Sequence, residues 1–114
     1  MADCIFCKIA QHKIQAKIVY EDEEIVAFRD VNPQAPVHIL IIPRKHIGSV
    51  NSLSEADDAL VGRIHRVGKK LVKEESCAET GFRLVLNTGP DAGQTVDHLH
   101  FHLLGGRRFS WPPG

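Results

Sequence analysis

The longest regular pattern in the chain is a helical one in its second half. Four apolar residues recur three or four positions apart: Leu60, Ile64, Val67 and Leu71. This is the spacing of one face of an α-helix. Ser54, with Asp57 three residues later, resembles a capping box in which Asp replaces the usual Glu. The pattern therefore predicts one long amphipathic helix that begins near Ser54 and ends near Cys77.

Strand-like segments fill most of the remaining chain. The run His38–Ile42 is apolar and of strand length, which predicts a central strand covered on both faces. The segment Val96–Leu104 alternates and predicts the last strand, which Gly105 and Gly106 end. The other expected elements are a short helix over Cys4–Gln11 and strands over Ile18–Tyr20, Ile25–Arg29 and Phe82–Asn87. Five strands without regular βαβ alternation indicate an α+β fold with an antiparallel sheet.

Size and charge narrow the function classes. The 114 residues predict a single domain over residues 1–114. Lys plus Arg and Asp plus Glu number 14 each, so no basic excess favours nucleic acid or a membrane surface. No apolar leader and no run of ~20 apolar residues is visible. Three cysteines, an odd number, suggest a reducing compartment, and the cytoplasm is the expected location.

The segment VDHLHFHLL places a histidine at every second position: His98, His100 and His102. Side chains of a strand alternate between faces, so the three imidazoles are expected on one face, roughly 6.5–7 Å apart. Leu99, Phe101 and Leu103 then point to the other face, toward a core. A polar, half-exposed strand face is the simplest alternative, but three histidines in register opposite an apolar face argue against it.

Two kinds of chemistry use such a row of imidazoles. A His-x-His pair binds zinc when a third ligand arrives from elsewhere, although the outer two of three are ~13 Å apart at the backbone. A neutral imidazole also attacks phosphorus and leaves again, while neighbouring imidazoles supply hydrogen bonds or protons. The preceding loop favours phosphate, because Gly89 and Gly93 let backbone N–H groups approach an anion closely.

With these residues in view, the chain resembles the histidine triad (HIT) family. Val96–Leu104 fits the family's His-φ-His-φ-His-φ-φ signature, where φ is apolar. CIFCKI, AFRDVNPQAPVHILIIPRKHI and GQTVDHLHFHLLGGRRFSWPPG occur in the order of its histidine-triad nucleotide-binding (Hint) branch. The resemblance implies a HIT-like fold with a five-stranded antiparallel sheet, one long helix and a short N-terminal helix. It also implies a homodimer in which two sheets join.

The resemblance implies a role for each matching residue. His100 would be the nucleophile, and His102 would contact the phosphate and assist protonation of the leaving group. His98 and His38 would orient His100, and Thr95 stands where the family usually has Ser and keeps a hydroxyl for proton relay. The nucleotide-binding residues would be Ile5, Phe6, Ile9, Phe28 and Val31 at the base, Asp30 at the ribose, Asn87, Gly93, Gln94 and Thr95 at the phosphate, and Trp111 reaching the partner subunit's site.

Cys4 and Cys7 form a CxxC pair that, with His46 and His98, has the ligand types of a Cys₂His₂ zinc site. Some CxxC-bearing relatives in the wider family resemble this arrangement. The alternative is that both thiols pack as small apolar groups. Zinc held by four protein ligands would be structural, since no coordination position stays open. The expected chemistry itself needs no cofactor.

The function expected from this resemblance is hydrolysis of purine nucleoside phosphoramidates, with AMP- or GMP-type nucleotides as ligands. The P–N bond breaks through a nucleotidyl intermediate on His100. A rival enzyme activity is dinucleoside polyphosphate hydrolysis or nucleotidyl transfer, which uses the same intermediate. A rival of another class is a non-catalytic nucleotide-binding regulatory protein. The WPPG tail favours phosphoramidate over polyphosphate, but enzyme and regulator need the same pocket.

Overall fold

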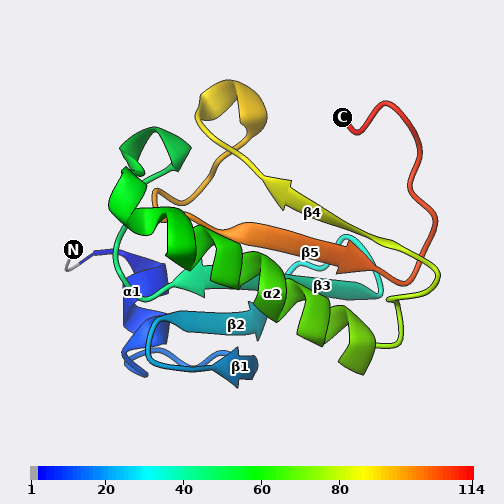
Figure 1. Cartoon of the computed structure of the whole chain (residues 1–114), viewed down its shortest axis with the longest axis horizontal. Coiled ribbons are helices and arrows are strands. Elements are labelled where there is room, and N and C mark those ends of the chain that lie inside the picture. Colours follow the sequence, from blue (N-terminus) through cyan, green and yellow to red (C-terminus); the bar gives the residue numbers. More distant parts are fainter. Residues whose placement is uncertain (1–2) are drawn as a thin grey trace.

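The computed structural model, which describes residues 3–114, contains the expected five-stranded antiparallel sheet with the strand order β1-β2-β3-β5-β4 (Figure 1). The strands span Ile18–Glu21 (β1), Ile25–Arg29 (β2), Val37–Pro43 (β3), Phe82–Leu86 (β4) and Phe101–Gly105 (β5). The helices span Ile5–Ala10 (α1) and Asp58–Glu74 (α2). No helix within residues 3–114 is long and apolar enough to cross a membrane.

The sheet separates two hydrophobic cores. The helix α2 crosses one face (Figure 1) and packs Ile64 and Leu71 against Ile39 and Ile41 of β3. On the other face α1 packs Phe6 and Ile9 against β2 and β3, including Phe28, Leu40 and Ile42. All seven residues of β3 are buried, which confirms the central strand predicted from its apolar run.

The start of the long helix was predicted correctly. Asp57 accepts a hydrogen bond from the backbone N–H of Ser54 (3.0 Å) and another from the Lys45 ammonium (2.8 Å). A short 3₁₀ turn, Glu55–Asp57, precedes α2, and the helix ends at Glu74, three residues before Cys77. The Asp57 carboxylate therefore satisfies a backbone donor that would otherwise lack a partner at the helix entrance.

The last strand is shorter than predicted. It begins at Phe101, paired with Ile41, so Val96–His100 lie outside the ladder. Continuing that register would place Pro43 opposite Leu99, but proline has no N–H to donate. The carbonyl of Pro43 instead accepts from the His98 ring (2.8 Å), and Leu99 donates its N–H to Ile47 (2.6 Å). The prediction of a strand from Val96 was therefore wrong by five residues.

Gly105 lies where β5 passes Cys77, and we expect Gly105→Ala to destabilise the fold. An added Cβ would sit 2.8 Å from the Cys77 Sγ and 3.2 Å from its Cβ. Overpacking of this kind costs about 1–3 kcal/mol, measurable by denaturant unfolding. The matched control is Gly62→Ala, where a Cβ meets nothing within 4 Å on the exposed side of α2. That change should add up to about 1 kcal/mol, and equal effects of the two would contradict the steric argument.

Candidate functional site

The triad histidines lie on the α1 side of the sheet. His102 is on β5 and His38 on the neighbouring strand β3, while His98 and His100 precede β5. Leu99, Phe101 and Leu103 belong to the core beneath α2. The predicted alternation therefore holds, although only His102 belongs to the ladder. The rings of His100 and His102 have centroids 5.0 Å apart.

One hydrogen bond fixes the tautomer of His100. Its Nδ1 lies 2.7 Å from the backbone carbonyl oxygen of His98, which can only accept. The Nδ1 therefore carries the proton, and in the neutral ring Nε2 keeps its lone pair. His100 is only 5% exposed, and Phe6 packs edge-on against its ring with centroids 5.0 Å apart. The geometry supplies an oriented imidazole whose neutral form has a free lone pair on Nε2.

A second chain of hydrogen bonds fixes His102. The backbone N–H of Gln34 donates to the Nδ1 of His38 (3.0 Å), so the His38 proton lies on Nε2. That Nε2 is 2.9 Å from the Nδ1 of His102 and 3.4 Å from a carboxylate oxygen of Asp30. The Nδ1 of His102 therefore accepts, and its own proton lies on Nε2. The site thus pairs an imidazole lone pair with an imidazole N–H donor.

This arrangement corrects one sequence-based expectation. His98 and His38 were both expected to orient His100. His98 does so, through its backbone carbonyl and not its ring, whereas His38 contacts His102. No motif in the sequence marks this partner, because the contact depends on the register in which His38 pairs with Leu104 and Leu40 with His102.

Burial keeps the site histidines neutral. It lowers the pKa of His102 from 6.5 to about 4, assisted by the nearby His100 and His38 and opposed by Asp30. Burial also lowers the pKa of His38, against the opposing effect of the Asp30 carboxylate. The pKa of His98 is lowered by burial as well, and His46 and His100 add to that effect. At neutral pH the tautomers assigned above to His38 and His102 are therefore those of uncharged rings.

The pKa of His102 predicts a pH-dependent stability. Because the folded pKa (about 4) is below the unfolded one (6.5), the unfolded state takes up the proton first. The stabilising contribution is complete above pH 6.5 and is lost as pH falls through 4, to a total of about 3 kcal/mol. We expect His102→Gln to lose less unfolding free energy than the wild type over this range, measured by denaturant unfolding in chelator. Parallel pH curves for the two proteins would contradict the assignment.

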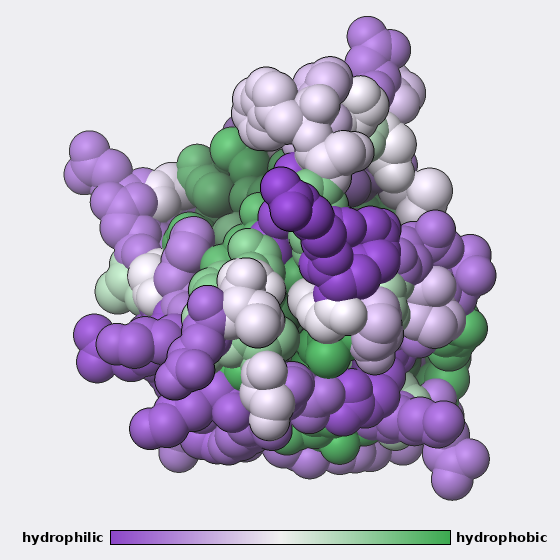
Figure 2. Space-filling view, turned by 90° about the vertical axis from the view of Figure 1, so that its right-hand side faces the viewer, coloured by the Kyte–Doolittle hydropathy of each residue, from purple (hydrophilic) through white to green (hydrophobic). Residues whose placement is uncertain are grey.

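A cleft of about 720 Å³ lies beside the relay of Asp30, His38 and His102. It is lined by Gln15, Ala16, Lys17, Arg29, Asp30, Val31, Pro33, Pro36 and His38. Lys17 brings a positive charge to it, whereas the guanidinium of Arg29 is paired with the Glu75 carboxylate. Sequence inspection missed both residues. Figure 2 shows the end of the molecule where β2 and β5 finish, with hydrophilic side chains rimming hydrophobic surface.

The residues expected at the base fall into two groups. Phe6, Ile9 and Phe28 are buried together in the α1-side core. The other group is exposed: Val31 fully, at the cleft beside His38, and Ile5 by 46%. Trp111, which was expected at the partner subunit's site, is 82% exposed.

The loop before the triad holds the residues expected at the phosphate. Gly93 is exposed with φ +81°, a left-handed conformation that favours glycine, and Thr95 is exposed beside it. Asn87 is half-buried at the end of β4. Gln94 braces the loop, because its amide nitrogen donates to the carbonyls of Gly48 (2.7 Å) and Val96 (3.1 Å). Its side chain is therefore already engaged within the protein.

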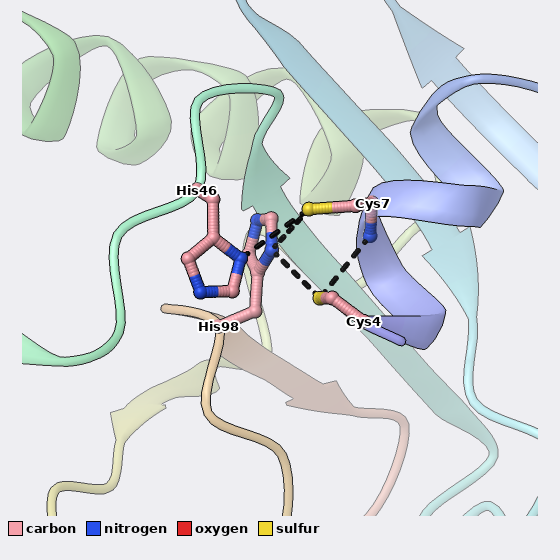
Figure 3. A group of neighbouring side chains, drawn as sticks. All are labelled: Cys4, Cys7, His46 and His98. Atoms are coloured by element: carbon pink, nitrogen blue, oxygen red, sulfur yellow. Dashed lines mark hydrogen bonds between the residues drawn. The ribbon is translucent and has the colours of Figure 1, made fainter. Parts of the chain in front are cut away.

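The structure brings Cys4, Cys7, His46 and His98 together, as predicted for a metal site (Figure 3). Their donor atoms all lie within 4.8 Å of one another. The Nδ1 of His98 is 3.3 Å from the Sγ of Cys4 and 3.5 Å from that of Cys7, whose Sγ is also 3.3 Å from the Nδ1 of His46. Tetrahedral zinc bonds of ~2.3 Å to sulfur and ~2.05 Å to nitrogen require an S···N separation of ~3.6 Å.

The surroundings of these donors also suit a metal. The Nε2 of His98 donates to the Pro43 carbonyl, which leaves a lone pair on the Nδ1 that faces the thiols. Burial raises the pKa of the Cys7 thiol, and the adjacent Cys4 raises it further. Two neighbouring thiols therefore resist ionising together unless a cation binds them. The donor set fits zinc, with no position left open for water.

Comparisons with known proteins show the family of this chain. A family model described as "Scavenger mRNA decapping enzyme C-term binding" matches residues 3–109. An uncharacterized HIT-like protein of Synechocystis sp. is 50% identical over 112 residues, covering 98% of this chain and 97% of that protein. The chain belongs to the histidine triad (HIT) family.

Two solved structures of related proteins have the same fold. A HIT family hydrolase from Legionella pneumophila superposes with a TM-score of 0.97 at 52% identity, covering 98% of this chain and all of that one. A histidine triad nucleotide-binding protein from Candida albicans gives a TM-score of 0.82 at 32% identity, covering 96% of this chain and 83% of that one. The chain therefore has the fold and the sequence character of HIT family hydrolases.

Proposed function

We propose that this protein hydrolyses the P–N bond of purine nucleoside phosphoramidates through a covalent nucleotidyl intermediate on His100. The observation that carries the proposal is the hydrogen bond from the Nδ1 of His100 to the His98 carbonyl, because it leaves the Nε2 lone pair free to attack. The rings of His100 and His102 lie 5.0 Å apart, so the N–H donor of His102 is within reach of the same phosphate.

The reaction follows from these two tautomers. The Nε2 of His100 forms a bond to phosphorus as the P–N bond breaks and the amine leaves with an added proton. The positive charge that develops on the His100 ring is stabilised by the His98 carbonyl at Nδ1. A bound phosphate anion raises the pKa of His102 from its low unliganded value, so His102 supplies that proton. Water then attacks phosphorus and gives a proton back to His102, the Nε2–P bond breaks, and a nucleoside monophosphate is released.

The rest of the nucleotide fits the remaining surfaces. Asp30, half-buried at the cleft beside His38, would accept from the ribose hydroxyls. The exposed Ile5 and Val31 would cover the base above the buried Phe6, Ile9 and Phe28. The glycine-rich loop with Thr95 would take the phosphate oxygens. The nucleotide-binding protein of Candida albicans supports a nucleotide ligand.

The homodimer belongs to the same proposal. Trp111 is 82% exposed near the end of the C-terminal tail. The guanidinium groups of Arg83 and Arg107 lie over the ring of Phe109 in the same tail. The strand β4 is an edge of the sheet, and an edge strand has free backbone groups that pair with another strand. A partner at this edge would cover Trp111 and bring it to the second site. The cytoplasmic location stays a prediction.

The test compares two substrates in steady state. One is an adenosine 5′-phosphoramidate with a fluorescent amine, and the other is a diadenosine polyphosphate. Cleavage of the phosphoramidate with kcat/KM at least about tenfold above the polyphosphate supports the proposal. Comparable rates on both would favour the dinucleoside polyphosphate hydrolase or transferase. AMP binding without turnover of either would favour the regulatory protein.

We also propose that Cys4, Cys7, His46 and His98 hold a structural zinc ion. When bound, the ion would cross-link α1 to the loop after β3 and to the segment before β5. No substrate group reaches it through an open position, so the residues of the triad carry the chemistry alone. Zinc content near one per chain, measured on protein purified without chelator, supports this, and a content near zero would remove it.

A further inference from the structure

The segment that carries the nucleophile is not held by the sheet. The ladder between β3 and β5 begins at Phe101, so His98, Leu99 and His100 precede it. In a strand the neighbouring backbone fixes each residue, but here other contacts must do so. Those contacts determine where the Nε2 lone pair of His100 points.

Two of these contacts lead directly to the proposed metal ligands. The His98 ring is fully buried, with Nε2 on the Pro43 carbonyl and Nδ1 against both thiols, and the carbonyl of the same residue accepts from His100. The N–H of Leu99 donates to the carbonyl of Ile47, the residue after His46. His98 is therefore part of the segment that orients His100. His46 immediately precedes Ile47, the residue to which this segment is hydrogen-bonded.

A third contact comes from α1. Phe6 lies between Cys4 and Cys7 in the chain, and its ring packs edge-on against His100 and His98, with centroids 5.0 and 6.0 Å away. A helix of six residues is too short to be stable alone and depends on its packing. Cys4 and Cys7 lie at the start of α1 (Figure 3), so fixing both cysteines would also fix the Phe6 ring that covers His100.

We propose that Cys4, Cys7 and His46 are positioning residues for the nucleophile, and that zinc at this cluster holds His100 in the Nδ1–H tautomer through His98 and Phe6. The expected effect on turnover rests on the proposed function. The expected effect on the tautomer of His100 is independent of it. The His98 carbonyl and the Phe6 ring are both within contact of His100, and both belong to the segments that carry the ligands. Loss of the ion would leave His100 held only by the hydrogen bonds of His98 and Leu99 and by the packing of Phe6, on segments that the ion no longer cross-links.

The experiment uses the full chain with ¹⁵N-labelled histidine, loaded with zinc and then stripped with chelator. Long-range ¹H–¹⁵N correlation spectra report which ring nitrogen carries the proton, and His100→Asn assigns the signal. We expect one Nδ1–H tautomer with zinc and a mixture without it. The half-buried His46 gives the matching variant, because His46→Ala removes one ligand and leaves His98 in place. It should show the mixture whether or not zinc is added.

Turnover of the phosphoramidate gives the second readout. A misplaced nucleophile should lower kcat by on the order of 10²-fold, with KM changed less than about twofold. Cys77→Ala is the matched control, because Cys77 is a buried thiol on the other side of the sheet, in the α2-side core. In Cys77→Ala, removal of zinc should lower kcat by the same factor as in the wild type. Should the chain lack phosphoramidase activity, the tautomer of His100 still decides the structural claim.

Two results would overturn the proposal. One is the same His100 tautomer in zinc-loaded and stripped protein, which would show that packing alone positions the ring. The other is a fall in kcat accompanied by an equal fall in folded fraction, as judged by circular dichroism at the assay temperature. In that case the metal would stabilise the fold without orienting the nucleophile.

Discussion

We expect His100→Asn to abolish phosphoramidate turnover while AMP still binds within a few-fold of its wild-type affinity. Removal of a nucleophile costs on the order of 10⁴-fold or more in kcat, because the remaining groups cannot form the intermediate. The substitution removes the Nε2 atom of His100 with its lone pair, whereas the cleft beside Asp30 and His38 stays intact. Stopped-flow turnover and calorimetric AMP binding measure the two effects separately.

The control for this change is His12→Asn, which makes the same substitution at an exposed histidine bonded to Glu21. Its turnover should equal that of the wild type. Imidazole added to His100→Gly should restore part of the activity, because a free base then occupies the emptied position. Turnover retained in His100→Asn, or loss of AMP binding alone, would mean that another group performs the attack.

We expect Cys7→Ser to lower the thermal midpoint by about 10 °C or more and to abolish its response to chelator. Binding of structural zinc stabilises a folded chain by several kcal/mol, and each kcal/mol shifts the midpoint of a domain of this size by several degrees. Cys7 is buried, and its Sγ approaches both His46 and His98, so Ser there cannot replace the thiolate. Scanning calorimetry with and without chelator measures the effect.

Cys77→Ala again provides the comparison, because its thiol lies among Val72, Leu71 and other residues of the α2-side core, away from the donor atoms. It is expected to lose some stability from the small cavity and to keep the full chelator response. If chelator leaves the wild-type midpoint unchanged, the two thiols of α1 are packing groups only.

The sequence predicted the elements whose pattern is local. The apolar run before Pro43 and the spacing from Leu60 to Leu71 each specify an element without reference to its neighbours, and both were correct. The strand from Val96 was wrong because its limit is set by a residue 55 positions away. Pro43 offers no donor, and its carbonyl is already bonded to the His98 ring. No pattern within VDHLHFHLL contains that information.

In the candidate site, too, only the features set by local motifs could be predicted from the sequence. Motif spacing predicted the cluster of Cys4, Cys7, His46 and His98, and the structure brings these four residues together. The contact between His38 and His102 follows from the pairing of β3 with β5 and so needed the register. The tautomers depend on Gln34 and on a backbone carbonyl, neither of which any motif marks.

The two cores on opposite faces of the sheet give the molecule separate regions for stability and for ligand choice. Ile64 and Leu103 belong to the core between α2 and the sheet, on the face opposite the side chains of the triad, so we expect volume-conserving changes there to alter mainly the melting temperature. Phe6 and Phe28 lie in the α1-side core beneath the expected base and also pack α1 against the sheet. Each change there would therefore alter both stability and ligand choice. Engineers who want a more robust variant should work beneath α2, and those who want a different nucleobase should accept that the α1 side requires compensation.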